Sequence, residues 1–210
     1  MAGRIEAVVW DVGRVLVEWD LRALYRRHIA DAGQLEWFVT NVVTESWHAQ
    51  HDAGADIHAM VAQRSAEFPE LADLIALYPD NFNQTIPGPV PGTHALVEAL
   101  AAAGVPQYAI TNFGAYVWQR FRPTQPVLDH LRAVVVSGEE RLVKPDPAIF
   151  HLAQARFGHP ASAMLFIDDN AANIAAAQAC GWQAHHFAGG VAGCSAGALA
   201  ADLAARGLLN

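Results

Sequence analysis

The sequence of 210 residues is poor in lysine and cysteine and has no long apolar run. Its arginines are scattered and its net charge is −8, which disfavours a nucleic acid as a partner. No segment approaches the about 18 apolar residues that a membrane span requires. The two cysteines and the absence of a signal-peptide pattern are typical of a cytoplasmic protein. We therefore expect a cytoplasmic monomer or homodimer without nucleic acid or membrane partners.

What the chain does contain is an alternation of short apolar runs and helical patterns. The helical patterns at 92–103, 147–157 and 170–180 end at glycines, and the second begins with a proline. This order predicts an α/β fold, a Rossmann-like three-layer core with a parallel sheet. The predicted strands lie at 5–10, 107–111, 133–137, 163–167 and 183–187.

The stretch from about 20 to 85 breaks the alternation, because it carries only helical periodicity. It is predicted to be a helical insert after the first strand. Pro87, Pro89 and Pro91 then form a stiff return to the core.

Polar residues follow the predicted strands at the edge of the sheet where an open parallel sheet binds its ligand. They are Asp11, Thr111, Asn112, Lys144, Asp168 and Asp169. Three carboxylates at one edge repel one another and require cations. Mg²⁺ is a suitable cation, and Lys144, the single lysine of the chain, supplies a further positive charge.

This set predicts phosphoryl transfer, in which Asp11 attacks phosphorus to give an aspartyl-phosphate. Mg²⁺ is held by Asp11, Asp169 and a main-chain carbonyl, the Thr111 hydroxyl holds phosphoryl oxygens, and Lys144 offsets the repulsion between nucleophile and substrate. Structural alternatives exist for each residue: Asp11 and Thr111 as helix caps, and Lys144 as a solvated turn residue.

Four segments resemble, in order, the motifs of the haloacid dehalogenase (HAD) superfamily of hydrolases, and the pattern covers residues 5 to about 188. The insert is similar to the small C1-type cap of that family, which implies a core of 1–18 and 86–210 and a cap of 19–85. Within the superfamily the chain most resembles bacterial sugar-1-phosphate phosphatases and the phosphatase domain of soluble epoxide hydrolase. The four segments are DVGRVL (11–16), ITN (110–112), KPDP (144–147) and IDDNAANI (167–174).

The resemblance implies a magnesium-dependent hydrolase of small phosphorylated metabolites, sugar phosphates among them. It assigns Asp11 as nucleophile, the Gly13 carbonyl and Asp169 as metal ligands, and Asp168 as a neighbouring carboxylate or a ligand through water. Further, it implies that Thr111, Asn112 and Lys144 contact the phosphoryl group and that Asn173 braces the last motif.

Gly13 is a departure, because most phosphatases of the family carry there a second aspartate that acts as general acid and base. Three explanations are open. Glu18, Asp20 or a cap residue supplies the proton, the leaving group needs little help to depart, or the enzyme turns over poorly. The sugar-phosphate relatives also carry glycine at this position.

Two other functions stay open. Haloacid dehalogenases also lack the second aspartate and need no metal, but an acidic pair such as Asp168 and Asp169 is costly without a cation. A phosphometabolite-binding protein on a weakened scaffold is the alternative outside enzymes. Phosphonate hydrolysis through a lysine imine in the cap is excluded, since the cap has no lysine.

Other residues have ambiguous roles. Arg14 is expected either to reach an anion in the cleft or to pair with an acidic residue at its rim. His48 and His51 have helical metal-ligand spacing but no evident third ligand, so structural roles are favoured. Trp47, His51 and Asp52 are candidates to face the substrate from the cap.

Overall fold

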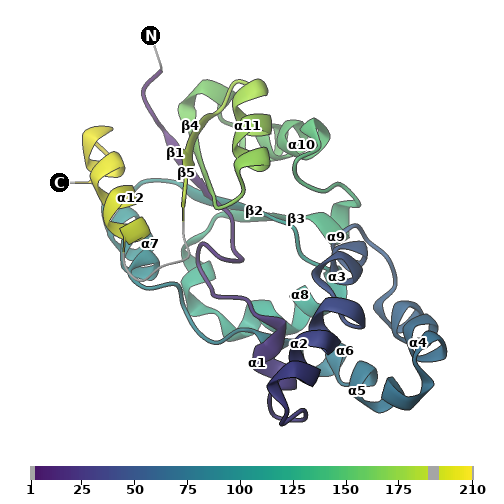
Figure 1. Cartoon of the computed structure of the whole chain (residues 1–210). Helices are drawn as coiled ribbons and strands as arrows, with labels where there is room; N and C mark the ends of the chain where they lie inside the picture. The colour runs from purple at the N-terminus through teal and green to yellow at the C-terminus, as the bar shows by residue number, and fades with distance from the viewer. Residues whose placement is uncertain (1–2, 189–193, 210) are drawn as a thin grey trace.

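The core is a five-stranded parallel sheet in the order β3-β2-β1-β4-β5 (Figure 1). The computed structural model describes residues 3–188 and 194–209. The strands are β1 (Ala7–Trp10), β2 (Gln107–Thr111), β3 (Ala133–Val136), β4 (Met164–Asp168) and β5 (Gln183–His186). The five predicted strands are thus confirmed, with ends that shift by one or two residues. Strands β1, β2 and β4 are buried along their whole length, which is why they appear as unbroken apolar runs.

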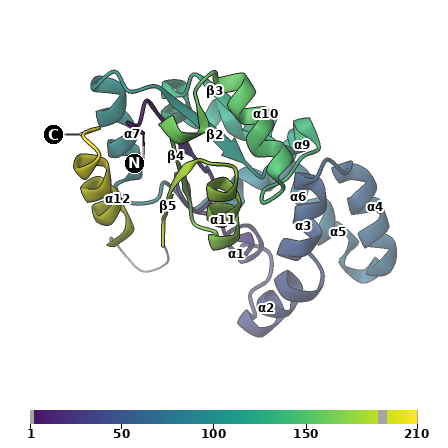
Figure 2. The ribbon, with the colours of Figure 1, turned by 90° about the horizontal axis from the view of Figure 1, so that it is seen from above.

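Helices cover both faces of the sheet, because successive strand residues point to opposite sides. On one face Val9 and Phe166 pack with residues of α10 (Pro147–Phe157) and α11 (Ala171–Ala179). On the other face Val8 and Leu165 belong to a second cluster with residues of α7 (Thr93–Ala102), α8 (Ala115–Phe121) and α12 (Cys194–Ala205). The result is the predicted three-layer α/β arrangement (Figures 1 and 2).

Short elements complete the core between these strands and helices. The helix α9 spans Ser137–Glu140 directly after β3. Single 3₁₀ turns occur at η3 (Arg122–Thr124), η4 (Pro126–His130) and η5 (Ala161–Ala163). Among the described residues, no helix combines the length and apolar character needed to cross a membrane.

The segment between β1 and β2 is helical up to residue 85, as predicted, and lies beside the sheet rather than in it (Figures 1 and 2). Asp20, Asp31, Thr44 and Asp56 cap its first four helices through side-chain oxygens that accept main-chain N–H groups. The helices are α1 (Leu21–Tyr25), α2 (Ala32–Asn41), α3 (Glu45–Asp52), α4 (Ile57–Glu67), η1 (Pro69–Leu71), α5 (Ala72–Ala76), α6 (Tyr78–Asn81) and η2 (Phe82–Thr85).

The chain leaves and re-enters the core at one place, where the two crossings are hydrogen-bonded to each other. The amide of Glu18 donates to the carbonyl of Gly88 at 2.8 Å, and the amide of Val90 donates to the carbonyl of Leu16 at 3.0 Å. Val17 and Pro89 form an antiparallel bridge between these bonds. This neck fixes the start of the helical segment close to the end of β1.

Candidate active site

The parallel register brings the ends of β1, β2 and β4 to one edge of the sheet. Trp10 pairs with Ala109 of β2 and with Ile167 of β4, so the next residues of these strands lie at the same level. Asp11 continues the ladder, since its amide donates to the carbonyl of Ile167 at 2.8 Å. The predicted residues Asp11, Thr111 and Asp168 therefore come from three adjacent strand ends.

Lys144 lies between two of the carboxylates. Its Nζ is 2.9 Å from Oδ1 of Asp11 and 2.7 Å from Oδ2 of Asp168, and its side chain is only 1% exposed. A buried ammonium between two carboxylates is not the solvated turn residue of the structural alternative. The single lysine of the chain is thus part of the acidic cluster.

Asn112 holds the main chain of Lys144 at two points. Its Oδ1 accepts the Lys144 amide at 2.8 Å, and its Nδ2 donates to the Lys144 carbonyl at 3.0 Å. This pairing fixes where the lysine side chain begins. The predicted contact of Asn112 with substrate stays a prediction, although Asn112 lines the adjacent cavity.

Asp168 is fully buried and its oxygens are satisfied by protein groups. The Asn170 amide donates to Oδ1 at 2.8 Å, and Nδ2 of Asn173 is 3.0 Å from both oxygens. The bracing role predicted for Asn173 is confirmed. Asp169 is only partly buried, and His186 donates from Nε2 to its main-chain carbonyl at 2.9 Å. Of the two aspartates, Asp169 has the more available carboxylate.

Burial dominates the electrostatics of the cluster. It raises the pKa of Asp11 well above its ordinary value, although Lys144 acts in the opposite direction, and Asp168 adds to the increase. The pKa of Asp169 is raised by burial and by Asp168. Burial also opposes the charge on Lys144, but Asp11 and Asp168 outweigh it and raise the pKa of the ammonium. The single ammonium therefore does not offset the effect of burial on Asp11 and Asp169.

The cluster fits a divalent cation. One oxygen each of Asp11, Asp168 and Asp169 lie within 4.8 Å of one another, and they are the only such group of three potential ligand residues among the described residues. Hard oxygen donors of this kind suit Mg²⁺. The Thr111 hydroxyl is buried without a hydrogen-bond partner, which leaves a polar atom available for a ligand at the same edge.

A cavity of about 280 Å³ lies between this edge and the helical segment. From the core it is lined by Gly13, Asn112, Phe113 and Asn170, and from the helical segment by His48 and Asp52 among others. Much of the remaining wall is apolar, formed by Val17, Trp19, Ala49, Phe82 and Ile86. The cavity therefore has an apolar wall and a polar wall, and the polar wall includes the chain neighbours Gly13, Asn112 and Asn170 of the cluster residues.

Arg14 contacts two residues that line this cavity. Its guanidinium forms an ion pair with Glu45 of α3 and lies 5.0 Å from the centre of the Trp19 ring. Of the two roles expected for Arg14, the structure shows the pairing with an acidic residue. This pair connects the turn after β1 to the helical segment.

The histidines of α3 do not form a metal site. Nδ1 of His48 is 2.6 Å from the Tyr78 hydroxyl, and Nδ1 of His51 is 2.8 Å from the Ala55 carbonyl. The favoured structural roles are therefore supported by these contacts. Of the substrate-facing candidates Trp47, His51 and Asp52, only Asp52 lines the cavity.

Sequence reasoning did not identify Tyr78 and Ser137. Tyr78 orients His48, and the buried Ser137 hydroxyl donates to the Asp52 carbonyl at 2.7 Å while accepting the Phe113 amide at 2.9 Å. Ser137 lies 85 positions from Asp52 in the chain, and no local pattern relates the two. These contacts attach the end of α3 to the loop after β2.

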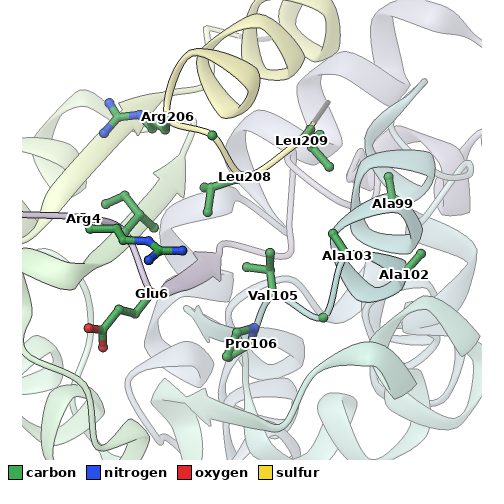
Figure 3. Close-up of a pocket in the computed structure, with 13 residues that line it drawn as sticks. Arg4, Glu6, Ala99, Ala102, Ala103, Val105, Pro106, Arg206, Leu208 and Leu209 are labelled. Atoms are coloured by element: carbon green, nitrogen blue, oxygen red, sulfur yellow. The ribbon is translucent and has the colours of Figure 1, made fainter.

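A larger hollow of about 990 Å³ lies at the opposite edge of the sheet (Figure 3). Val105 and Pro106 precede β2 there, and Leu208 and Leu209 lie across from the end of α7. Its wall contains residues that precede β1 and β2, whereas the wall of the smaller cavity contains Gly13, Asn112 and Asn170, which follow Asp11, Thr111 and Asp169. Size alone therefore does not mark the candidate active site.

A family model described as haloacid dehalogenase-like hydrolase matches residues 5–181. The chain is 23% identical over 205 residues to the sesquiterpene phosphatase astK of Aspergillus oryzae, an alignment that covers 92% of this chain and 95% of the relative.

Two solved structures have the same fold. The HAD family enzyme bt-2542 of Bacteroides thetaiotaomicron, in a magnesium complex, has a TM-score of 0.66 at 20% identity and covers 88% of this chain and 93% of its own. The L-2-haloacid dehalogenase of Xanthobacter autotrophicus, with chloropropionic acid covalently bound, has a TM-score of 0.64 at 19% identity and covers 98% of this chain and 85% of its own.

Proposed function

The chain belongs to the haloacid dehalogenase-like hydrolase family, and we propose that it is a Mg²⁺-dependent phosphatase of small phosphate monoesters. The observation that carries this proposal is the group of Asp11, Asp168, Asp169 and Lys144, in which all but Asp169 are buried. A group with three carboxylates and one ammonium suits a metal cation and a phosphoryl group together. The phosphatase name of the fungal relative and the magnesium complex of the bacterial structure support the same reaction.

In the proposed reaction Asp11 is the nucleophile. A carboxylate oxygen of Asp11 attacks phosphorus, the bond from phosphorus to the ester oxygen breaks, and an aspartyl-phosphate forms. Water then attacks this phosphorus and restores the Asp11 carboxylate. Lys144 fixes Asp11 through its 2.9 Å contact, and the free Thr111 hydroxyl donates to a phosphoryl oxygen.

Asp11, Asp169 and the Gly13 carbonyl would hold the metal, with Asp168 beside them or bound through water. When bound, Mg²⁺ supplies positive charge that keeps the carboxylates ionised and offsets the charge of the phosphoryl oxygens. Asp168 serves this arrangement by holding Lys144, since its remaining bonds go to Asn170 and Asn173.

The helical segment, residues 19–85, is proposed to act as a cap over the cavity. The volume of about 280 Å³ suits a compact alcohol, and the walls formed by Trp19, Phe82 and Phe113 favour one with an apolar face. A sugar phosphate, the other candidate, would use the polar side made by His48 and Asp52. An assay panel of aryl, alkyl and sugar phosphates distinguishes these classes.

A dehalogenase is the second candidate, because a haloacid dehalogenase has the same fold. That reaction uses an aspartate on carbon without a metal. The three clustered carboxylates of this chain would then stay uncompensated, so we rank the phosphatase first.

The test is release of phosphate from p-nitrophenyl phosphate with Mg²⁺ and with a chelator. Turnover is expected only with Mg²⁺, and Asp11→Asn is expected to reduce kcat by more than about 10³-fold. Asp31→Asn is the matched control, because Asp31 is an exposed cap of α2 where asparagine serves equally well. Chloride release from 2-chloropropionate that survives chelation would favour the dehalogenase, and tight phosphoester binding without turnover would favour a binding protein.

A further inference from the structure

The proposed phosphatase has no side chain at Gly13 to protonate the leaving group. Gly13 lines the cavity, and a Cβ atom built on it meets nothing within 4 Å. An alkoxide is a poor leaving group, and positioned proton transfer to it is worth about 10²–10⁴-fold in rate. Efficient hydrolysis of an alkyl phosphate would therefore require a donor elsewhere in the cavity.

Three acidic residues other than Asp52 are unsuitable as the proton donor. Glu18 is exposed and does not line the cavity. Asp20 caps α1, forms ion pairs with Arg22 and Arg26, and does not line the cavity. Glu45 does line the cavity, but it is exposed and paired with Arg14.

Asp52 has the required position. It is the last residue of α3, is 8% exposed, and lines the same cavity as Gly13 and Asn112. Its carbonyl accepts the Ser137 hydroxyl, which in turn accepts the amide of Phe113, next to Asn112. The end of α3 is thus attached to the loop that follows Thr111.

The carboxyl group of Asp52 is not saturated by hydrogen bonds. Its Oδ1 is buried and makes none, and its neighbour there is Nε2 of His48 at 3.2 Å. His48 is oriented by Tyr78 of α6, whose hydroxyl lies 2.6 Å from Nδ1. A buried carboxyl group on the wall of a cavity, with hydrogen-bonding capacity left, is a feature that a substrate would satisfy.

The surroundings of Asp52 favour proton exchange near neutral pH. Burial raises the pKa of Asp52 to about 7, while His51, the Gly114 main-chain amide and Lys144 act in the opposite direction. Burial lowers the pKa of His48 to about 4, so that this ring is neutral; Glu45 opposes the decrease and Arg14 adds to it. The carbonyl end of α3, where Asp52 lies, also disfavours a negative charge.

We propose that Asp52 is the general acid and base of this phosphatase, in place of the side chain that Gly13 lacks. As Asp11 attacks phosphorus and the ester bond breaks, the Asp52 carboxyl gives its proton to the departing oxygen, which leaves as a neutral alcohol. The Asp52 carboxylate then takes a proton from the water that attacks the aspartyl-phosphate. The carboxyl group and the Asp11 carboxylate are both restored.

This assignment rests on the proposed function, and leaving-group dependence tests it separately. In Asp52→Asn, kcat/KM for n-propyl phosphate is expected to fall by about 10²–10⁴-fold. The value for p-nitrophenyl phosphate, whose leaving group needs no proton, is expected to fall by less than about tenfold. Asparagine keeps an acceptor for the Gly114 amide, and Asp31→Asn is the matched control that should change neither value.

The pH dependence of the wild type gives a readout that needs no variant. The kcat/KM for n-propyl phosphate, relative to p-nitrophenyl phosphate, should fall as the pH rises past about 7, because the acid loses its proton. Gly13→Asp added to Asp52→Asn should restore part of the propyl phosphate activity, since the space at position 13 is open.

Equal losses on both esters, or no loss on either, would overturn the assignment of Asp52 and leave the phosphatase intact. The same holds if the two wild-type pH profiles are parallel. Absence of magnesium-dependent turnover of either ester by the wild type would overturn both proposals.

Discussion

Replacing Lys144 by methionine should destabilise the protein strongly. Methionine has a similar length and would pack on Phe166, whose ring centre lies 5.3 Å from the lysine Nζ. The change removes the ammonium that touches Asp11 and Asp168 and leaves both carboxylates buried. Removing one partner of a buried ion pair costs about 3–5 kcal/mol. For a domain of this size the expected decrease in Tm is about 6–20 °C.

The loss of stability in Lys144→Met should increase as the pH rises. Burial already raises the pKa of Asp11 in the folded state, and removing the ammonium of Lys144, which acts in the opposite direction, raises it further above the value in the unfolded chain. The folded state then binds this proton more tightly, so stability is greatest at low pH and is lost as the pH rises through the raised pKa of Asp11. Lys144→Met should therefore be closer to the wild type near pH 5 than near pH 8.

Mg²⁺ should restore part of the stability that Lys144→Met loses. A ligand at 100 times its Kd stabilises the folded state by about 2.7 kcal/mol, and the variant has more uncompensated negative charge to offer. The increase in Tm caused by Mg²⁺ should thus be at least as large in Lys144→Met as in the wild type. Thermal unfolding followed by circular dichroism, at two pH values with and without Mg²⁺, measures all of these effects.

A surface pair provides the control. Arg156 lies 2.6 Å from Glu140 with its side chain 39% exposed, so Arg156→Met should change the stability by at most about 1 kcal/mol. If Lys144→Met were no less stable than Arg156→Met, and unaffected by pH or Mg²⁺, the reasoning that the ammonium offsets buried carboxylates would be wrong.

Two further variants test the supports of the site. Asn173→Ala removes the side-chain donor to both Asp168 oxygens and should lower stability by about 1.5–3 kcal/mol, with weaker Mg²⁺ protection in thermal unfolding; unchanged stability would deny the bracing role. Gly114→Ala places a Cβ atom 1.8 Å from Cδ2 of His51 and should destabilise by about 1–3 kcal/mol in chemical denaturation, an effect that His51→Ala in the same chain should relieve.

The sequence was sufficient for the sheet and the acidic cluster, because both depend on local patterns. A buried parallel strand appears as an apolar run, and the residues where it ends lie at the ligand edge, as for Asp11 directly after β1 and Thr111 at the end of β2. The helical nature of residues 20–85 was likewise readable from periodicity. The extent of the cap as a separate unit stays a prediction.

The contacts made by the helical segment could not be read in this way. Tyr78 meets His48 across 30 positions, and Ser137 meets Asp52 across 85, so packing alone decides these pairs. The pairing of the Asn112 side chain with the main chain of Lys144, 32 positions away, also depends on packing and was not predicted. The chemistry of the reaction determines the residue types of a motif, whereas the tertiary structure determines which residues they contact.

The environments of Asp11 and Asp52 differ in the cations that each carboxyl group faces. Asp11 touches the ammonium of Lys144 and belongs to the group that suits a divalent cation, so bound metal would favour its ionised, nucleophilic form. Asp52 touches neither cation site directly and ends a helix among the aromatic rings near His48. Burial raises the pKa of both groups, to about 8 for Asp11 and to about 7 for Asp52. A phosphatase that attacks with one carboxylate and protonates with another needs the pKa of the nucleophile to be the lower of the two, and a divalent cation bound beside Asp11 would lower it.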